Sequence, residues 1–347
     1  MGPRPMLLIV ALVAVGALIF HIVSAYSNDI TRAKERVSRG AQVAATAVGP
    51  IEYADNGAGP AILSIHGAGG GYDQGLANIA DFVNDNFRVI APSRFGYLGT
   101  PIPSDALGAS QADAHAALLA ELRVDKAVVV GISAGARSAV ELAIRHPERV
   151  SALILIVPGT YAPSSPVAVE ASRTSALVLW LVNSGADFAW WATERIAPSV
   201  LIRFIGVSPR LFASSSEVEQ ARVMQIVRDI NPLSRRFPGI NVDSNPELPS
   251  PSFEEIRVPT LIISTRDDLF NTLPAAEFAA AHIPKAKLVV YENGGHLLVG
   301  RQQEVRAVVR DFVANEVGQT VQSNAPANAQ RRLGGSQSRK GGRDGSP

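Results

Sequence analysis

Short apolar runs of strand length alternate with helix-like segments through most of this 347-residue chain. Two of the runs, residues 127–130 and 152–157, are almost purely apolar, which is typical of strands buried on both faces of a parallel sheet. Further strands are expected over residues 61–65, 87–91, 260–263 and 287–291, and helices over residues 111–122, 134–146 and 304–317. This alternation predicts an α/β fold with a mostly parallel, doubly wound sheet.

The alternation stops between about residues 159 and 251, where the pattern becomes helical. Helices are expected there over residues 177–182, 188–196, 200–205 and 217–230, and all three tryptophans (Trp180, Trp190 and Trp191) fall in this stretch. An insertion after the carboxyl end of a strand lies where ligands bind in α/β sheets. We therefore interpret about residues 160–250 as a helical cap over the site. An alternative places some of its Trp and Phe side chains against a bilayer.

The first apolar run, residues 6–23, is interrupted only by Gly16 and His21. With the two small residues that follow, it reaches the length that a helix needs to cross about 30 Å of hydrocarbon. Two interpretations stay open: a single-pass transmembrane anchor over residues 1–26, or a signal peptide cut after Ala25. The anchor is favoured, because the apolar core of a signal peptide is usually only about 7–15 residues long.

Residues 27–48 hold four basic residues between Arg32 and Arg39 and are expected to form a basic juxtamembrane linker. Only Arg4 precedes the apolar run, so the positive-inside rule favours a membrane protein whose following domain is cytoplasmic. The signal-peptide interpretation would instead make that domain secreted or periplasmic. Residues 317–347 lack apolar periodicity and are rich in Gly, Ser, Asn, Gln and Arg, which predicts a disordered basic tail.

Composition narrows the class of the central domain, residues 49–316. Hydrophobic residues make up 47% of the chain and charged residues 18%, which supports a sizeable core. The absence of cysteine excludes disulfide scaffolds, thiolate zinc sites and a cysteine nucleophile. The net charge of +1 conceals two basic ends around a central domain that carries 22 basic and 28 acidic residues. No nucleic acid partner is expected for such an acidic domain.

Gly131, Ser133 and Gly135 form a G-x-S-x-G motif between a predicted strand and a predicted helix. That context is the one in which the motif presents a nucleophilic serine. The abrupt turn places the serine at a strained apex, and the flanking glycines remove side chains that would clash there. A helix N-terminus also favours developing negative charge. Ser133 is therefore the candidate nucleophile.

A glycine-rich loop, residues 66–73, follows directly on a predicted strand. It lacks the Gly-Lys-Ser/Thr of a Walker loop, and Tyr72 and Gln74 stand where a G-x-G-x-x-G motif needs glycine. Because glycines let backbone N–H groups approach a substrate oxygen, we expect an oxyanion hole. Its donors would be the N–H groups of Ala68 and Ala134.

A serine nucleophile needs a base, and the base needs an orienting acid. Of the six histidines, His296 alone lies in a glycine-flanked loop after a late strand. The others are His21 in the apolar run, His66 in the glycine-rich loop, and His115, His146 and His282 on or at the ends of predicted helices. The acid candidates are Asp267 and Asp268, beyond the strand at residues 260–263. The order Ser, Asp, His is that of α/β-hydrolases.

The chain resembles the capped, small-molecule type of α/β-hydrolase from about residue 51 to residue 313. The matching pieces are His66-Gly67, Arg94-Phe95-Gly96-Tyr97, the Ser133 turn, Val258-Pro259-Thr260 and Gly295-His296. Counted from Val258-Pro259, the family's aspartate falls on Asp268, although Thr265 stands where the family usually has glycine. Asp267 remains the substitute. The resemblance implies an α/β-hydrolase fold and a catalytic triad of Ser133, Asp268 and His296.

Serine at this turn sets the chain apart from epoxide hydrolases and haloalkane dehalogenases, which use aspartate. The resemblance implies a serine esterase that cleaves an ester of a small, mostly apolar substrate through an acyl-enzyme. Alternatives are carbon–carbon bond hydrolysis or perhydrolysis on the same triad, action on membrane lipids, and a non-catalytic ligand-binding protein. No cofactor and no metal are expected, because the sequence lacks H-E-x-x-H and clustered His/Asp spacing.

Overall fold

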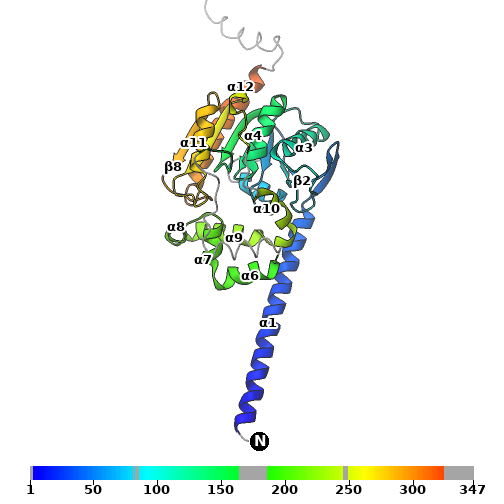
Figure 1. Cartoon of the computed structure of the whole chain (residues 1–347), viewed down its shortest axis with the longest axis vertical. Helices are drawn as coiled ribbons and strands as arrows, with labels where there is room; N and C mark the ends of the chain where they lie inside the picture. Colours follow the sequence, from blue (N-terminus) through cyan, green and yellow to red (C-terminus); the bar gives the residue numbers. More distant parts are fainter. Residues whose placement is uncertain (1–2, 81, 83–85, 164–185, 245–248, 324–347) are drawn as a thin grey trace, which may run out of the picture.

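Strands and helices alternate along the chain after a long N-terminal helix, as Figure 1 shows for this computed structural model. The structure describes residues 3–80, 82, 86–163, 186–244 and 249–323. In chain order the main elements are α1 (Pro3–Arg39), β1 (Gln42–Thr46), β2 (Gly49–Asn56), β3 (Ala61–Ile65), α2 (Tyr72–Ala80), β4 (Arg88–Pro92), α3 (Gly108–Glu121), β5 (Ala127–Ile132), α4 (Gly135–Arg145), β6 (Val150–Ile156), α6 (Asp187–Ile196), α7 (Pro198–Phe204), α8 (Pro209–Ser214), α9 (Glu217–Asp229), α10 (Phe237–Asp243), β7 (Thr260–Thr265), α11 (Leu273–His282), β8 (Lys287–Tyr291) and α12 (Gln302–Ser323). Short 3-10 turns lie at Pro147–Arg149, Leu233–Arg235 and Phe253–Glu255.

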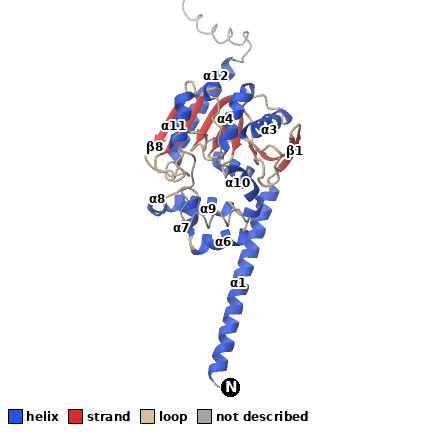
Figure 2. Ribbon diagram, viewed as in Figure 1, coloured by secondary structure: helices blue, strands red, loops and turns tan. Residues whose placement is uncertain are grey.

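The strands form one eight-stranded sheet in the order β1-β2-β4-β3-β5-β6-β7-β8, with helices on both faces (Figure 2). Strands β4, β3, β5, β6, β7 and β8 run parallel, whereas β2 is antiparallel to both β1 and β4. The inner strands are buried on both faces, which explains their nearly continuous apolar sequences. The predicted mostly parallel, doubly wound sheet is confirmed.

Alternate residues of β5 belong to two different hydrophobic cores. Val129 packs with residues of α3, α4 and α11 on one face of the sheet. Val128 and Val130 pack with Val305 and Val309 of α12 on the other face. The carboxyl end of β5, where Ser133 lies, is therefore fixed from both sides.

Residues 27–48 differ from the linker that the sequence suggests. Helix α1 continues unbroken to Arg39, and β1 is an edge strand whose Gln42 stands opposite Tyr53 of β2. Ala44 is buried, while most of β1 is exposed. Its apolar run is only three residues long, and Ala44 is its one buried residue, so the hydrophobic pattern does not mark this edge strand.

Helices α6 to α10 lie between β6 and β7, within the segment expected to form a cap. Together with Tyr97 and Val299 of the sheet domain, they enclose a hydrophobic core around Trp190, Leu201 and Val223. The Trp190 indole donates a hydrogen bond to the Val227 carbonyl, 2.9 Å away, and so ties α6 to α9. The helix predicted over residues 177–182, including Trp180, lies outside the described residues.

The first half of α1 projects away from the rest of the molecule (Figure 1). An 18-residue window within Met6–Arg39 has a mean hydropathy of 2.9 and no buried residue, so this helix is long and apolar enough to span a membrane. At the other end, α12 extends to Ser323, so residues 317–323 are helical rather than part of a disordered tail. The remainder of the predicted tail, residues 324–347, lies outside the described residues.

Candidate active site

Ser133 stands at the sharp turn between β5 and α4. Its φ is +51°, in the left-handed region that a non-glycine residue rarely adopts. Backbone hydrogen bonds hold this conformation: the Ser133 N–H donates to Ile156 O at 3.0 Å, and Ser133 O accepts from the Gly159 N–H at 2.9 Å. The strained turn predicted from the G-x-S-x-G motif is therefore present, and neighbouring strands enforce it.

The two glycines of the motif are required by close packing. A Cβ on Gly131 would come within 2.5 Å of the Ala139 Cβ, and a Cβ on Gly135 within 2.4 Å of the His66 carbonyl oxygen. Neither distance is compatible with a side chain. The glycines thus let α4 pack directly against β5 and the loop after β3.

Ser133, His296 and Asp268 form a continuous hydrogen-bonded chain. The His296 Nε2 lies 2.8 Å from the Ser133 Oγ, and the His296 Nδ1 lies 2.8 Å from the Asp268 Oδ2. The Asp268 carboxylate also accepts hydrogen bonds from the Thr272 hydroxyl at 2.5 Å and the Phe270 N–H at 2.8 Å. The structure therefore brings together the three residues that the sequence nominates.

The neighbouring Asp267 has a different partner. Its Oδ1 accepts a hydrogen bond of 2.7 Å from the Gly295 N–H, in the loop that carries His296. Asp267 thus positions the histidine loop, whereas Asp268 contacts the imidazole. The geometry favours Asp268 over Asp267 as the orienting acid.

Asp268 is 7% exposed, and its environment keeps it ionised. Burial alone raises the pKa of the carboxyl, but the charge and hydrogen bond of His296, together with the Thr272 hydroxyl and the Phe270 amide, outweigh it. The pKa of Asp268 consequently lies below its usual value. A carboxylate held ionised at this distance stabilises an imidazolium.

The backbone N–H groups of Ala68 and Ala134 lie at the two turns that meet at Ser133. A Cβ on Gly67 would come within 3.1 Å of the Ser133 Cβ, which shows how closely the glycine-rich loop approaches the serine. Within the described part of the chain, neither N–H donates a hydrogen bond to the protein. Both donors are therefore available to a substrate oxygen, as an oxyanion hole requires.

His66 supports this loop through hydrogen bonds. Its Nε2 accepts a hydrogen bond from the Arg94 N–H at 2.9 Å, so its Nδ1 carries the proton and donates to Gly67 O at 2.7 Å. Burial, followed by the nearby Arg94 charge, lowers the pKa of His66 well below its usual value. His66 is thus a neutral support of the Gly67–Ala68 turn.

The remaining histidines lie away from Ser133. His115 is buried in α3 and contacts the Ser138 hydroxyl at 3.2 Å. His146, which caps α4, contacts Asp113, and His282 contacts a carbonyl of its own helix. His21 is exposed on α1. His296 is the histidine that the structure places against the serine.

Buried ion pairs connect the cap to the sheet domain, and sequence reasoning did not find them. Arg94, in the loop after β4, binds both carboxylate oxygens of Asp243 in α10, at 2.8 and 2.6 Å. The Tyr97 hydroxyl donates to the same carboxylate at 2.5 Å. Because 149 positions separate Arg94 from Asp243, no local pattern signals the pair.

A second clamp lies next to the glycine-rich loop. Arg236 of the cap binds both oxygens of Asp73 in α2, at 3.1 and 2.8 Å, and donates to Gly70 O at 2.5 Å. Burial raises the pKa of Asp73, but Arg236 and Arg36 outweigh it and hold that pKa at about 2. A hydrogen bond from Arg236 thus joins the cap directly to the glycine-rich loop that contains Ala68.

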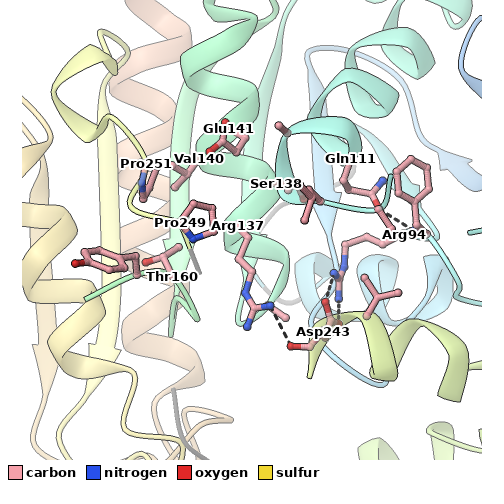
Figure 3. Close-up of a pocket in the computed structure, with 18 residues that line it drawn as sticks. Arg94, Gln111, Arg137, Ser138, Val140, Glu141, Thr160, Asp243, Pro249 and Pro251 are labelled. Carbon is pink, nitrogen blue, oxygen red and sulfur yellow. Dashed lines mark hydrogen bonds and ion pairs between the residues drawn. The ribbon is translucent and has the colours of Figure 1, made fainter. Parts of the chain in front are cut away.

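A cavity of about 160 Å³ borders the candidate oxyanion donor Ala134 (Figure 3). Apolar side chains such as Phe95 and Leu107 line much of it, and Arg137 and Thr160 add polar groups. The Thr160 hydroxyl is buried there without a hydrogen-bond partner in the described structure. Among the described residues, neither Ser133 nor His296 lines this cavity, so it lies beside the reacting atoms rather than around them.

Comparisons with known proteins agree with this architecture. The sequence profile of the alpha/beta hydrolase family matches residues 62–308. A 2-hydroxy-6-oxo-6-phenylhexa-2,4-dienoate hydrolase from Burkholderia cepacia is 28% identical over 279 residues, which cover 76% of this chain and 91% of that protein. A pimeloyl-[acyl-carrier protein] methyl ester esterase from Aromatoleum aromaticum is 27% identical over 269 residues, covering 73% of this chain and 98% of the esterase.

Among solved structures, an alpha/beta hydrolase fold protein from Nakamurella multipartita superposes with a TM-score of 0.57 and 26% identity. The match covers 78% of this chain and 98% of that one. With the profile match over residues 62–308, this shows that the chain belongs to the alpha/beta hydrolase family. The relatives are named hydrolases and esterases, and the chain is accordingly a hydrolase.

Proposed function

We propose that this protein is a serine hydrolase in which Ser133 is the nucleophile, His296 the general base and Asp268 the orienting acid. The observation that carries the proposal is the pair of 2.8 Å contacts that join the three side chains. The positive φ of Ser133 supports it further, because strain at a turn is retained where function needs it.

The contacts of the three side chains support the following steps. His296 Nε2 accepts the Ser133 proton as the Ser133 Oγ attacks an ester carbonyl, and Asp268 stabilises the imidazolium that forms. The Ala68 and Ala134 N–H groups stabilise the tetrahedral oxyanion. His296 then donates its proton to the leaving alkoxide, which departs as an alcohol and leaves an acyl-enzyme. Water, deprotonated by His296, hydrolyses the acyl-enzyme and restores Ser133. In this scheme the chain's own residues supply the nucleophile, the base, the orienting acid and the oxyanion donors, and water is the second reactant.

A carbon–carbon bond hydrolase is the second candidate. One relative is named for hydrolysis of 2-hydroxy-6-oxo-6-phenylhexa-2,4-dienoate. That compound carries a ketone and a carboxylate but no ester, so its hydrolysis must break a carbon–carbon bond. Another relative is named as a methyl ester esterase, so both chemistries occur among the relatives.

The two candidates are separated by initial rates on a panel of p-nitrophenyl esters of increasing acyl length and on a 2-hydroxy-6-oxo-dienoate. Wild type and Ser133→Ala are measured side by side. We expect ester hydrolysis that Ser133→Ala abolishes. Dienoate turnover with negligible ester turnover would establish the second candidate. If neither the esters nor the dienoate are hydrolysed in a way that depends on Ser133, the result would support a non-catalytic binding protein.

We further propose that residues 6–23 of α1 form a single-pass membrane anchor that is retained in the mature protein. Support comes from their exposure and from the unbroken helix that continues through Ala25 to Arg39. The charge bias of the flanks favours a cytoplasmic catalytic domain. Intact mass spectrometry of the membrane fraction tests the anchor, because a signal peptide predicts a chain that begins after Ala25.

A further inference from the structure

The second half of α1 packs on the cap and on α2 along one stripe. Tyr26, Ile30, Ala33 and Val37 recur at helical spacing, and Ile30 and Val37 are buried. Residues 6–21 of the same helix are exposed on every side. Near Ile22 the helix therefore changes from an apolar segment exposed on every side to a segment that packs against the rest of the protein.

Aromatic contacts mark the point where α1 reaches α6. The Tyr26 ring lies edge-on to Phe188, with centroids 5.2 Å apart, and to Trp191 at 5.6 Å. Phe188 and Trp191 also stack on one another at 5.7 Å. Tyr and Trp side chains that gather at one end of an apolar span are typical of a membrane–water interface.

Ion pairs and hydrogen bonds fix α6 relative to α1. Asp29 accepts a hydrogen bond from the Trp191 indole at 2.9 Å and pairs with Arg195 at 2.5 Å. The Arg195 guanidinium lies 4.1 Å from the centre of the Trp191 ring. Further along the helix, Arg36 pairs with Asp73 and donates to Asn231 O at 2.9 Å. The position of α1 in a bilayer therefore sets the position of the cap.

The outer side of α6 presents apolar residues to the surroundings. Ile196 is 83% exposed and Phe188 is 48% exposed, whereas Trp190 on the inner side of the helix is buried. Arg195 on the same helix and Arg32 on the adjoining turn of α1 both pair with Asp29, and their side chains are 41% and 71% exposed. Large exposed apolar side chains beside cations are typical of a surface that contacts anionic lipid.

Distances along α1 place this face at the bilayer surface. Tyr26 is three residues beyond Val23, the last large apolar residue of the run, which is about 4.5 Å along a helix. The headgroup layer on each side of the hydrocarbon is about 5–8 Å thick. Figure 1 shows α6 and α7 at the end of the molecule toward which the apolar half of α1 projects.

We infer that the outer face of α6, formed by Phe188, Arg195 and Ile196, rests in the headgroup layer of the bilayer that α1 spans. The partner of this surface is a phospholipid membrane containing anionic lipid. The inference rests on the proposed membrane anchor. It places the cap, rather than the opposite end of the sheet, against the membrane, so that substrates dissolved in the bilayer lie next to the cap.

Site-directed spin labelling tests the inference directly, because the chain has no native cysteine. The full chain is reconstituted in nanodiscs of phosphatidylcholine and phosphatidylglycerol. Single nitroxides are placed at Ile196→Cys and Phe188→Cys. Val13→Cys reports the span of α1, and Lys126→Cys, exposed immediately before β5 at the far end of the sheet, is the aqueous control.

We expect labels at 196 and 188 to be reached more readily by lipid-soluble oxygen than by a water-soluble nickel complex. The label at 13 should be deeper still, and the label at 126 fully aqueous. Aqueous labels at 196 and 188 with a buried label at 13 would overturn the inference while leaving the anchor intact. An aqueous label at 13 would overturn both. Dipolar broadening between labels at 196 would overturn it in favour of a second copy of the chain.

Discussion

The sheet domain and the assembly of α1 with the cap are held together in different ways. The candidate triad lies on turns at the carboxyl ends of β5, β7 and β8. Backbone hydrogen bonds fix the Ser133 turn, and short sequence motifs indicate which side chains are functional. The cap is attached by buried side-chain ion pairs between segments far apart in sequence, such as Arg94 with Asp243. We propose that the first region performs the chemistry and that the second sets substrate access and the location of the enzyme.

The largest expected effect is a loss of kcat at Asp268 that the neighbouring Asp267 does not share. Asp268→Asn removes the charge that stabilises the His296 imidazolium, and we expect a loss of about 10⁴-fold in kcat. Asp267→Asn keeps an acceptor for the Gly295 N–H, so its loss should be far smaller. Steady-state kinetics of the two variants on one ester measures both. Equal losses, or a larger loss at Asp267, would contradict the assignment.

Arg236→Met is expected to give the next largest effect, on stability rather than on chemistry. It leaves the buried Asp73 carboxylate with Arg36 as its remaining cationic partner in the described structure. Breaking a buried pair from one side costs about 3–5 kcal/mol, and the remaining Arg36 should keep the loss near the lower end.

Arg36→Met is the matched comparison, because Arg36 pairs with the same Asp73 from α1. Its side chain is one-third exposed, so we expect a smaller loss of about 1 kcal/mol. Denaturant unfolding in detergent micelles gives both values. A larger loss for Arg36→Met would mean that α1, and not the cap, is the main support of Asp73.

The effect of acid on the Asp73 ion pairs should be intermediate in size between the losses expected for Arg236→Met and Arg36→Met. The Asp73 pKa of about 2 in the folded chain lies below the unfolded value of 3.8. The stabilisation is therefore fully present above pH 3.8 and is lost as the pH falls toward 2. The difference between these pKa values corresponds to about 2 kcal/mol. The stability difference between wild type and Asp73→Asn should shrink by this amount between pH 5 and pH 2, and a constant difference would contradict the paired carboxylate.

The sequence predicts the sheet domain well and the attachment of the cap poorly, for physical reasons. Strands β5 and β6 stand out because strands buried on both faces are apolar with little interruption. Ser133 and His296 stand out because glycines flank them at turns. Strand β1 is hidden because its apolar run is only three residues long.

Contacts between residues far apart in the sequence cannot be predicted from the hydrophobic pattern or from local motifs. In the sequence, Arg36 is simply one of a cluster of basic residues beside an apolar helix. In the structure it contacts α2 and the end of α9 at once. Similarly, Asp267 and Asp268 are adjacent and chemically identical, and only the packing of the Gly295–His296 loop gives them separate partners.

The most direct test of the central claim, that Ser133 is an activated nucleophile, is covalent labelling with a fluorophosphonate. Intact-mass and peptide mapping should find a single adduct on the peptide that contains Ser133 in wild type, and none in Ser133→Ala. Slower labelling of His296→Ala would show that activation depends on the base. Equal labelling of wild type and Ser133→Ala would contradict the account.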